Sequence, residues 1–243
     1  MARISVLIQD TLAAPAKRLR SPGARIAFDL DGTLIDARRR QVGVATEALA
    51  WATGERLEEA RFWRAKRSGA STRQALTELG YHAATAASVA QRWAERIEAD
   101  DWLDADRALP GVKRTLTALR AAGAVICVAT ARRRAGGARR SLQAAGLAPL
   151  IAELIVVVPA MAVPAKARAL RRWGAVAFIG DTETDGLASQ SAGVPFAAVT
   201  TGQRSPGYLS ARGYAPEKSL SAALATLTGS ASLAGRTPAK RTG

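Results

Sequence analysis

The sequence is poor in the residues that build disulfide frameworks and zinc sites. Its 243 residues include one cysteine, Cys127, and one histidine, His82. A lone cysteine excludes a disulfide framework, and a lone histidine excludes zinc sites built on several histidines. A catalytic triad would depend on His82 alone. We therefore expect a cytoplasmic protein in which any metal ion is held by oxygen atoms.

Long apolar runs and aromatic side chains are also scarce. Charged residues interrupt every apolar stretch before it reaches the roughly 20 residues of a membrane-spanning helix, so we expect no membrane association. Aromatic residues make up 5% of the chain, too few for a platform on which bases stack. The formal net charge is +15, but arginine is spread along the chain, and nucleic acid is not the expected partner. The oligomeric state, monomer or homodimer, stays open.

Hydrophobic residues are plentiful at 48%, which is enough for a substantial core. Short apolar runs predict buried strands at residues 26–28, 124–129, 154–158, 176–179 and 196–199. Helical patterns lie between them at 113–122, 137–145 and 165–173. This alternation indicates an α/β fold with a parallel sheet covered by helices on both faces.

One region breaks the alternation. Residues 37–108 contain no convincing strand and carry helical patterns at 44–53, 57–66, 72–79 and 85–99. We interpret this region as an all-helical insertion. The predicted organisation is an N-terminal extension (1–24), a core domain (25–36 and 109–228), an inserted helical domain (37–108) and a disordered basic tail (229–243).

Four loops at the ends of the predicted strands carry polar residues. The carboxyl ends of parallel strands meet at one edge of a sheet, so we expect these residues to lie close together. In chain order they are Asp29, Asp31, Gly32 and Thr33, then Thr130 and Ala131, then Lys166, and finally Asp181 and Asp185.

The first pair of carboxylates suits phosphoryl transfer. One carboxylate of Asp29 and Asp31 can attack phosphorus and form an acyl phosphate. The other can protonate the leaving oxygen and later activate water. Gly32 permits a tight bend that brings backbone amides near a phosphate, and Thr33 can cap the turn.

The polar residues after the later strands could bind a metal ion and the phosphoryl oxygens. Asp181 and Asp185 would complete an oxygen-only site for Mg²⁺. Without a metal, clustered carboxylates would repel a phosphate and would themselves rise in pKa. Lys166 and Thr130 can provide a positive charge and a hydroxyl donor to the phosphoryl oxygens.

Each of these residues also has an ordinary structural explanation. An aspartate after a strand is often part of a turn or a helix cap, and Thr130 alone would serve as a helix cap equally well. Lys166 alone would normally be a solvated surface charge. Their joint order at the strand ends favours the functional interpretation.

These motifs resemble those of the haloacid dehalogenase superfamily. Residues 29–33 read Asp-Leu-Asp-Gly-Thr, as in its first motif, and residues 180–185 resemble its acidic motif Gly-Asp-x-x-x-Asp. Val128-Ala129-Thr130 and Lys166 resemble the two motifs between them. The resemblance implies a Rossmann-like core, Asp29 as nucleophile and Asp31 as general acid and base. It also implies Mg²⁺ held by the Asp29 side chain, the Asp31 carbonyl and Asp181, with Asp185 assisting directly or through a water molecule.

The helical insertion is similar to the cap of the phosphoglycolate phosphatase and β-phosphoglucomutase subfamily. The resemblance implies a phosphatase acting on a small phosphorylated metabolite, with a cap that closes over the site. The candidates for binding a second anionic group of the substrate are Arg61, Arg64, Lys66 and Arg67. The alternative is that they form a solvated helix face.

Other functions stay open at this point. A phosphomutase would use the same two aspartates. A basic nucleic-acid-binding relative, with end-phosphatase activity or none, is a further alternative. Asp31 argues against a dehalogenase, because a halide leaves without a proton.

Overall fold

A parallel five-stranded sheet forms the centre of the computed structural model, which describes residues 18–19 and 21–229. The strands are β1 (Arg25–Phe28), β2 (Val125–Ala131), β3 (Glu153–Val157), β4 (Ala177–Gly180) and β5 (Phe196–Ala198). Their order is β3-β2-β1-β4-β5, and every neighbouring pair is parallel. The predicted α/β class and parallel sheet are confirmed.

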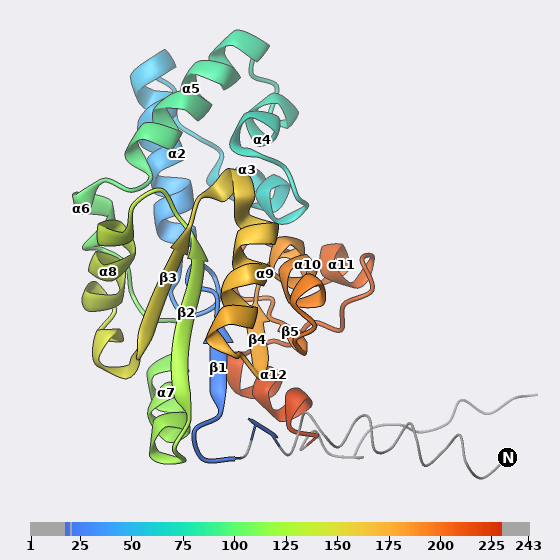
Figure 1. Ribbon diagram of the computed structural model, residues 1–243. Helices are drawn as coiled ribbons and strands as arrows, with labels where there is room; N and C mark the ends of the chain where they lie inside the picture. Colours follow the sequence, from blue (N-terminus) through green and yellow to red (C-terminus); the bar gives the residue numbers. More distant parts are fainter. Residues whose placement is uncertain (1–17, 20, 230–243) are drawn as a thin grey trace, which may run out of the picture.

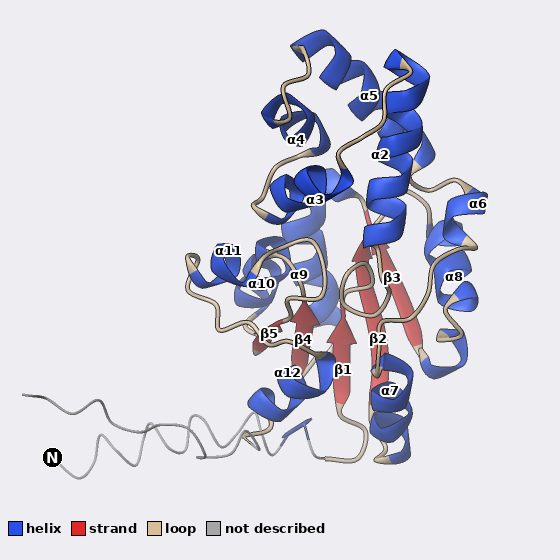
Figure 2. Ribbon diagram, turned by 180° about the vertical axis from the view of Figure 1, so that it is seen from behind, coloured by secondary structure: helices blue, strands red, loops and turns tan. Residues whose placement is uncertain are grey.

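Helices cover both faces of the sheet (Figures 1 and 2). Because successive strand residues point to opposite faces, Ile26 and Phe28 pack into one apolar cluster and Ala27 into another. The first cluster is completed by α7 (Val112–Ala121), α8 (Ala135–Ala144) and α12 (Leu220–Leu227). On the opposite face lie α9 (Ala162–Trp173) and α10 (Glu183–Ala192). Three short helical segments complete the core: η1 (Ala148–Leu150), η2 (Pro159–Met161) and α11 (Pro206–Ser210).

Between β1 and α7 the chain forms only helices, in the segment 37–108 that we call the helical insert. Its helices are α2 (Arg38–Thr53), α3 (Glu59–Arg67), α4 (Thr72–Glu78), α5 (Ala83–Arg96) and α6 (Asp100–Leu103). The insert has its own apolar cluster, which includes Leu49, Phe62, Leu76 and Val89. Helices α2 to α5 stand beyond the carboxyl ends of the strands, above the arrowheads in Figure 1.

The two chain segments that join the insert to the core lie side by side. The Asp36 amide donates to the Arg107 carbonyl at 2.9 Å, and the Leu109 amide donates to the Leu34 carbonyl at 3.0 Å. Ile35 and Ala108 form an antiparallel bridge between these hydrogen bonds. The insert therefore leaves and rejoins the core at one place.

The predicted terminal segments fall largely outside the described residues. Of the predicted extension (1–24), residues 1–17 and 20 are not described, and of the predicted tail only Gly229 is. Leu19 is buried and belongs to the main apolar cluster. None of the described helices has the length and apolarity needed to span a bilayer.

The packing of α7 against the sheet predicts a matched pair of leucine substitutions. Leu116 is fully buried, whereas Leu187 on α10 is 46% exposed. We expect Leu116→Ala to lower the free energy of unfolding by about 2–5 kcal/mol, because it removes buried methyl groups and leaves a cavity. Leu187→Ala should change it by less than about 0.5 kcal/mol. Urea unfolding followed by circular dichroism measures both, and equal losses would contradict this account of the core.

Candidate active site

Three buried carboxylates meet where β1 and β4 end. Asp29 directly follows β1, and its amide donates to the Ile179 carbonyl of β4 at 2.8 Å. Asp181 directly follows β4, and Asp185 lies in the first turn of α10. One carboxylate oxygen from each of the three lies within 4.8 Å of the others. The sheet order produces this cluster, because β1 and β4 are neighbours and their ends share an edge.

Lys166 enters this cluster from near the start of α9. Its Nζ lies 2.6 Å from Asp29 Oδ1 and 2.6 Å from Asp185 Oδ1, and its side chain is buried. Burial opposes the charge of the ammonium, but Asp185 and Asp29 outweigh it, so the Lys166 pKa is raised above its ordinary value. Lys166 is thus a fixed positive charge between two carboxylates.

Lys166 does not offset all of the negative charge. Burial raises the Asp29 pKa to about 7, although Lys166 acts in the opposite direction. Burial and the neighbouring charges of Asp29 and Asp185 raise the Asp181 pKa well above its ordinary value. Buried like charges and oxygen-only donors are the conditions that a hard divalent cation satisfies. The three aspartates therefore fit a site for such an ion.

Gly32 allows the loop after β1 to approach Asp181. Its φ is +85°, and a Cβ added to it would lie 2.5 Å from Asp181 Oδ2 and 2.6 Å from the Gly202 Cα. The Thr201 hydroxyl donates to the Gly32 carbonyl at 2.6 Å. The Gln203 amide donates to Asp181 Oδ2 at 2.6 Å. The segment 201–203 thus closes the site from the other side.

A cavity of about 400 Å³ opens onto the cluster. Of the predicted site residues, Asp29, Asp31, Thr130, Ala131, Lys166, Asp181 and Asp185 line it. Thr130 and Ala131 are the last two residues of β2, and Thr130 is buried. Gly32 and Thr33 lie beside the lining residues rather than among them, with the Thr33 hydroxyl 3.5 Å from Asp181 Oδ1.

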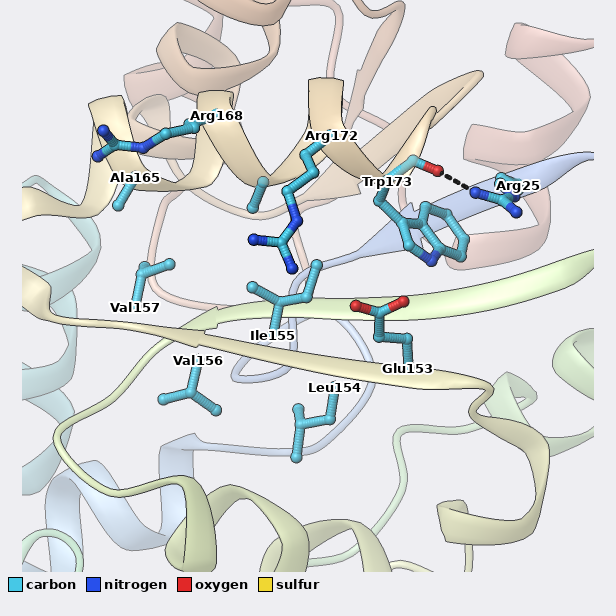
Figure 3. A pocket seen from close by; sticks show the side chains of 11 residues that line it. Arg25, Glu153, Leu154, Ile155, Val156, Val157, Ala165, Arg168, Arg172 and Trp173 are labelled. Atoms are coloured by element: carbon cyan, nitrogen blue, oxygen red, sulfur yellow. Dashed lines mark hydrogen bonds between the residues drawn. The ribbon is translucent and has the colours of Figure 1, made fainter.

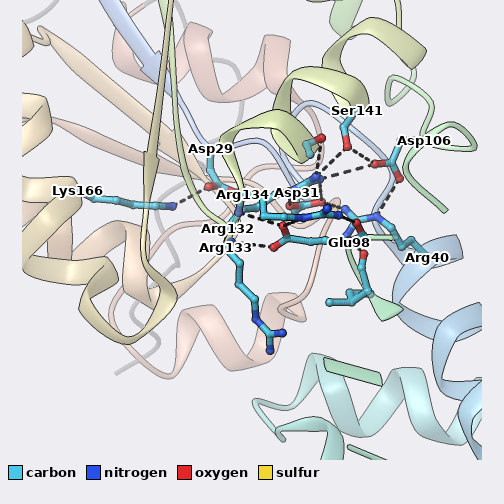
Figure 4. A network of polar contacts seen from close by, with 12 residues as sticks. Asp29, Asp31, Arg40, Glu98, Asp106, Arg132, Arg133, Arg134, Ser141 and Lys166 are labelled. Atoms are coloured by element: carbon cyan, nitrogen blue, oxygen red, sulfur yellow. Dashed lines mark hydrogen bonds and ion pairs between the residues drawn. The ribbon is translucent and has the colours of Figure 1, made fainter. Parts of the chain in front are cut away.

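Asp31 lines the same cavity, but two arginines hold its carboxylate (Figure 4). Arg132 donates from Nε to Asp31 Oδ2 at 2.7 Å and from Nη2 to Oδ1 at 2.8 Å. Arg40 donates to Oδ1 as well. Burial alone would raise the Asp31 pKa, but Arg132 and Arg40 lower it far below its ordinary value. Asp31 is therefore held as a carboxylate in a fixed orientation.

Asp106 and Ser141 hold the two arginines in turn. Arg40 Nε donates to Asp106 Oδ1 at 3.1 Å, and Arg132 Nη1 donates to the Ser141 hydroxyl at 2.8 Å. That hydroxyl donates to Asp106 Oδ2 at 2.7 Å. This network was not predicted from the sequence. Arg132 carried one usable signal, its position two residues after Thr130 at the end of a predicted strand.

The family model for haloacid dehalogenase-like hydrolases matches residues 25–193, more than half of the chain. The chain belongs to the haloacid dehalogenase-like hydrolase family. Among curated proteins, no sequence matches this hydrolase.

Solved structures of low sequence identity share the fold of this hydrolase. A haloacid dehalogenase-like family hydrolase from Streptococcus pneumoniae superposes with a TM-score of 0.62 at 19% identity, covering 80% of this chain and 92% of the other. A predicted phosphoglycolate phosphatase from Haemophilus somnus gives 0.57 at 21% identity, covering 76% and 88%. A predicted phosphatase from Clostridium acetobutylicum gives 0.65 at 17% identity, covering 86% and 100%. At these identities the likeness shows the fold alone.

The four basic residues predicted to read a second anion do not line the cavity of this hydrolase. Arg61 and Arg64 line a separate surface cavity of about 350 Å³. Arg61 is half exposed and forms an ion pair with Glu58 at 3.0 Å.

The other two basic residues do not line the cavity themselves, but each contacts a residue that does. Lys66 is buried, with its Nζ 5.2 Å from the centre of the Trp93 ring, and burial lowers its pKa to about 8. Arg67 donates to the Thr200 and Arg204 carbonyls at 2.7 and 3.0 Å. Arg67 therefore ties the insert to the core.

A second cavity, of about 620 Å³, lies beside the edge strand β3 and α9 (Figure 3). Arg25, Arg168, Arg172 and Glu153 line it together with apolar side chains. None of the clustered aspartates reaches it. The chemistry of the carboxylate cluster therefore belongs to the smaller cavity.

The close approach at Gly32 predicts a difference between two glycine substitutions. Gly32 and Gly54 both have a left-handed backbone, with φ of +85° and +74°, but a Cβ at Gly54 would meet nothing within 4 Å. Gly54→Ala should cost about 1–2 kcal/mol of stability through backbone strain. Gly32→Ala should cost about 1–3 kcal/mol more, because its Cβ collides with Asp181 and the Gly202 backbone. Chemical unfolding of both variants checks this, and equal losses would refute the close approach.

Proposed function

We propose that this hydrolase is a Mg²⁺-dependent phosphatase that cleaves a small phosphate monoester through an aspartyl-phosphate on Asp29. The observation that carries the proposal is the convergence of Asp29, Lys166 and two further aspartates on one cavity. The fold shared with a predicted phosphatase and a predicted phosphoglycolate phosphatase supports it.

In this proposal Asp29 is the nucleophile. Lys166 occupies Asp29 Oδ1, which leaves Oδ2 to attack phosphorus and form the acyl phosphate. Lys166 and Thr130 bind the transferred phosphoryl oxygens, and backbone groups of Gly32, Thr33 and Ala131 contribute further contacts.

The metal site uses oxygen atoms of the same cluster. We assign Mg²⁺ to the side chains of Asp29, Asp181 and Asp185 and to the Asp31 carbonyl. When bound, Mg²⁺ supplies the positive charge that offsets repulsion between the carboxylates and the phosphate.

Asp31 has the role of acid and base. Because Asp31 is ionised while Arg132 and Arg40 hold it, it first has to take up a proton as they release it. It then gives that proton to the leaving alcohol oxygen, and it takes another from the water that attacks the acyl phosphate. Both of its oxygens accept hydrogen bonds from Arg132. Arg132 therefore has to release at least one of these oxygens when substrate enters, and until then it orients the Asp31 carboxylate.

The phosphomutase and nucleic-acid alternatives have no comparable support, because no contact of the described residues favours either one. The cytoplasmic location stays a prediction.

Metal removal tests the proposal directly. We expect purified protein to hydrolyse p-nitrophenyl phosphate in the presence of Mg²⁺, to lose the activity when EDTA is added, and to regain it when excess Mg²⁺ is restored. Release of p-nitrophenol is the measurement. Hydrolysis that persists after complete chelation would reject the metal assignment, and no hydrolysis of any phosphate ester would reject the phosphatase proposal.

The nucleophile is tested by a conservative substitution. Asp29→Asn should lower kcat by about three orders of magnitude or more, because an amide cannot form the acyl phosphate. Asp36→Asn is the matched control, since Asp36 is exposed and its carboxylate accepts the Arg38 amide at 2.9 Å. The control should stay within about twofold of the unaltered enzyme. Activity that survives in folded Asp29→Asn protein would remove Asp29 from its role.

A further inference from the structure

The cations around the active-site cavity already have partners. Lys166 contacts two of the clustered aspartates at 2.6 Å. Arg132 and Arg40 are engaged by Asp31 and Asp106. A substrate group that needs a free cation would have to displace one of these contacts.

Two more arginines reach the cavity, and both are also engaged. Arg204 forms an ion pair with Glu183, with Nε 2.6 Å from Oε2. The Arg133 amide donates to Glu98 Oε1 at 2.8 Å, and its exposed guanidinium donates to the Ala94 carbonyl at 2.6 Å. Four of the five cations that line the cavity are therefore paired with carboxylates, and the fifth, Arg133, is exposed rather than buried in the interior of the cavity.

The formal charges of the lining residues balance. Five carboxylates and five cations line the cavity: Asp29, Asp31, Glu98, Asp181 and Asp185, with Arg40, Arg132, Arg133, Lys166 and Arg204. In the proposed function, Mg²⁺ compensates the charge of the scissile phosphate. A second anion on the substrate would thus enter without a counter-charge, and burying an unpaired charge is strongly unfavourable.

One neutral polar side chain at the same cavity, by contrast, lacks a hydrogen-bond partner. Gln41 of α2 lines the cavity and is only 6% exposed. Its Oε1 is buried and has no hydrogen-bond partner in the described structure. Its backbone is fixed, because its amide donates to the Ala37 carbonyl at 2.8 Å and its carbonyl accepts from Trp93 Nε1 at 3.1 Å. A buried acceptor without a partner is unfavourable, and a ligand that brings a donor would satisfy it.

Apolar side chains line the same cavity as Gln41. Trp93 and Ile97 also line the cavity. Together with the carboxamide they form a wall that suits the carbon chain and the hydroxyl group of a small alcohol.

We propose that the substrate is the phosphate ester of a small neutral alcohol, and that Gln41 selects it by hydrogen-bonding to a second hydroxyl or amide on the leaving group. This inference rests on the proposed phosphatase function. In the reaction, the bond between phosphorus and the alcohol oxygen breaks, the alcohol leaves with a proton, and the oxygen of water ends in inorganic phosphate. Esters whose leaving group carries a carboxylate are then poor substrates.

Two esters of nearly equal size test the charge preference. 2-Hydroxyethyl phosphate and 2-phosphoglycolate differ in whether the leaving group ends in a hydroxyl or a carboxylate. With saturating Mg²⁺ we expect kcat/KM to favour 2-hydroxyethyl phosphate by at least about tenfold. Equal values, a preference for phosphoglycolate, or turnover of p-nitrophenyl phosphate with no turnover of the hydroxyethyl ester would each overturn the inference. No turnover of any ester, p-nitrophenyl phosphate included, is instead the failure of the phosphatase proposal.

The role of Gln41 is tested by the ratio of the two kcat/KM values. Gln41→Met keeps the length of the side chain and removes its hydrogen-bonding groups, and it should lower the ratio of hydroxyethyl ester to phosphoglycolate by about tenfold. Gln41→Lys adds a cation to the wall and should lower the ratio further. Because both esters are measured on one preparation, partial unfolding of a variant does not change the ratio.

Gln91→Met is the matched control. Gln91 lies on α5, is exposed, and donates from Nε2 to Glu95 Oε1 at 3.1 Å, away from the cavity. This variant should keep the ratio of the unaltered enzyme. An unchanged ratio in Gln41→Met would show that Gln41 is only a packing residue.

Discussion

The buried carboxylates at the ends of β1 and β4 impose the constraint on which this site depends. Burial of Asp29, Asp181 and Asp185 within a few ångströms of one another is unfavourable unless positive charge accompanies them. Lys166 supplies part of that charge from α9. The rest has to come from outside the chain, so the sheet edge that places these residues together also creates the demand for a cation.

The second carboxylate of the loop after β1 is stabilised differently. Asp31 receives two arginines, and these are held by Asp106 and Ser141. Two carboxylates two residues apart thus lie in opposite electrostatic environments. For the roles proposed above, bound Mg²⁺ would keep Asp29 ionised, and release of Asp31 by its arginines would let that carboxylate take up the proton that it donates.

The sequence was informative where a local pattern determines structure. Each predicted strand was found within a few residues, because short apolar runs between loops are buried on both faces of a parallel sheet. The clustering of Asp29, Lys166 and Asp181 followed from their positions after the first, third and fourth strands along the chain. Their exact partners, such as the Gln203 amide at Asp181, depend on a loop with no such pattern.

Contacts between segments far apart in the sequence could not be predicted from local patterns. Arg40 and Asp106 are 66 residues apart, and nothing in either segment indicates the other. The sequence allowed the same two interpretations for Lys66 and Arg61, binding of a second anion or a solvated helix face, yet Lys66 is buried and Arg61 is half exposed. Only the packing of the insert decides between these outcomes, and so the residues that face the cavity from the insert were not predicted.

The paired segments at Ile35 and Ala108 affect how the helical insert could be replaced during evolution. Because the chain crosses from core to insert and back through adjoining hydrogen-bonded segments, the two ends of the insert meet at a single seam. Exchange of the whole insert for another helical unit would have to preserve this seam, together with the contacts that Arg40, Asp106 and Arg67 make with the core. Substrate preference can therefore diversify among descendants of such a protein while the catalytic sheet is inherited intact.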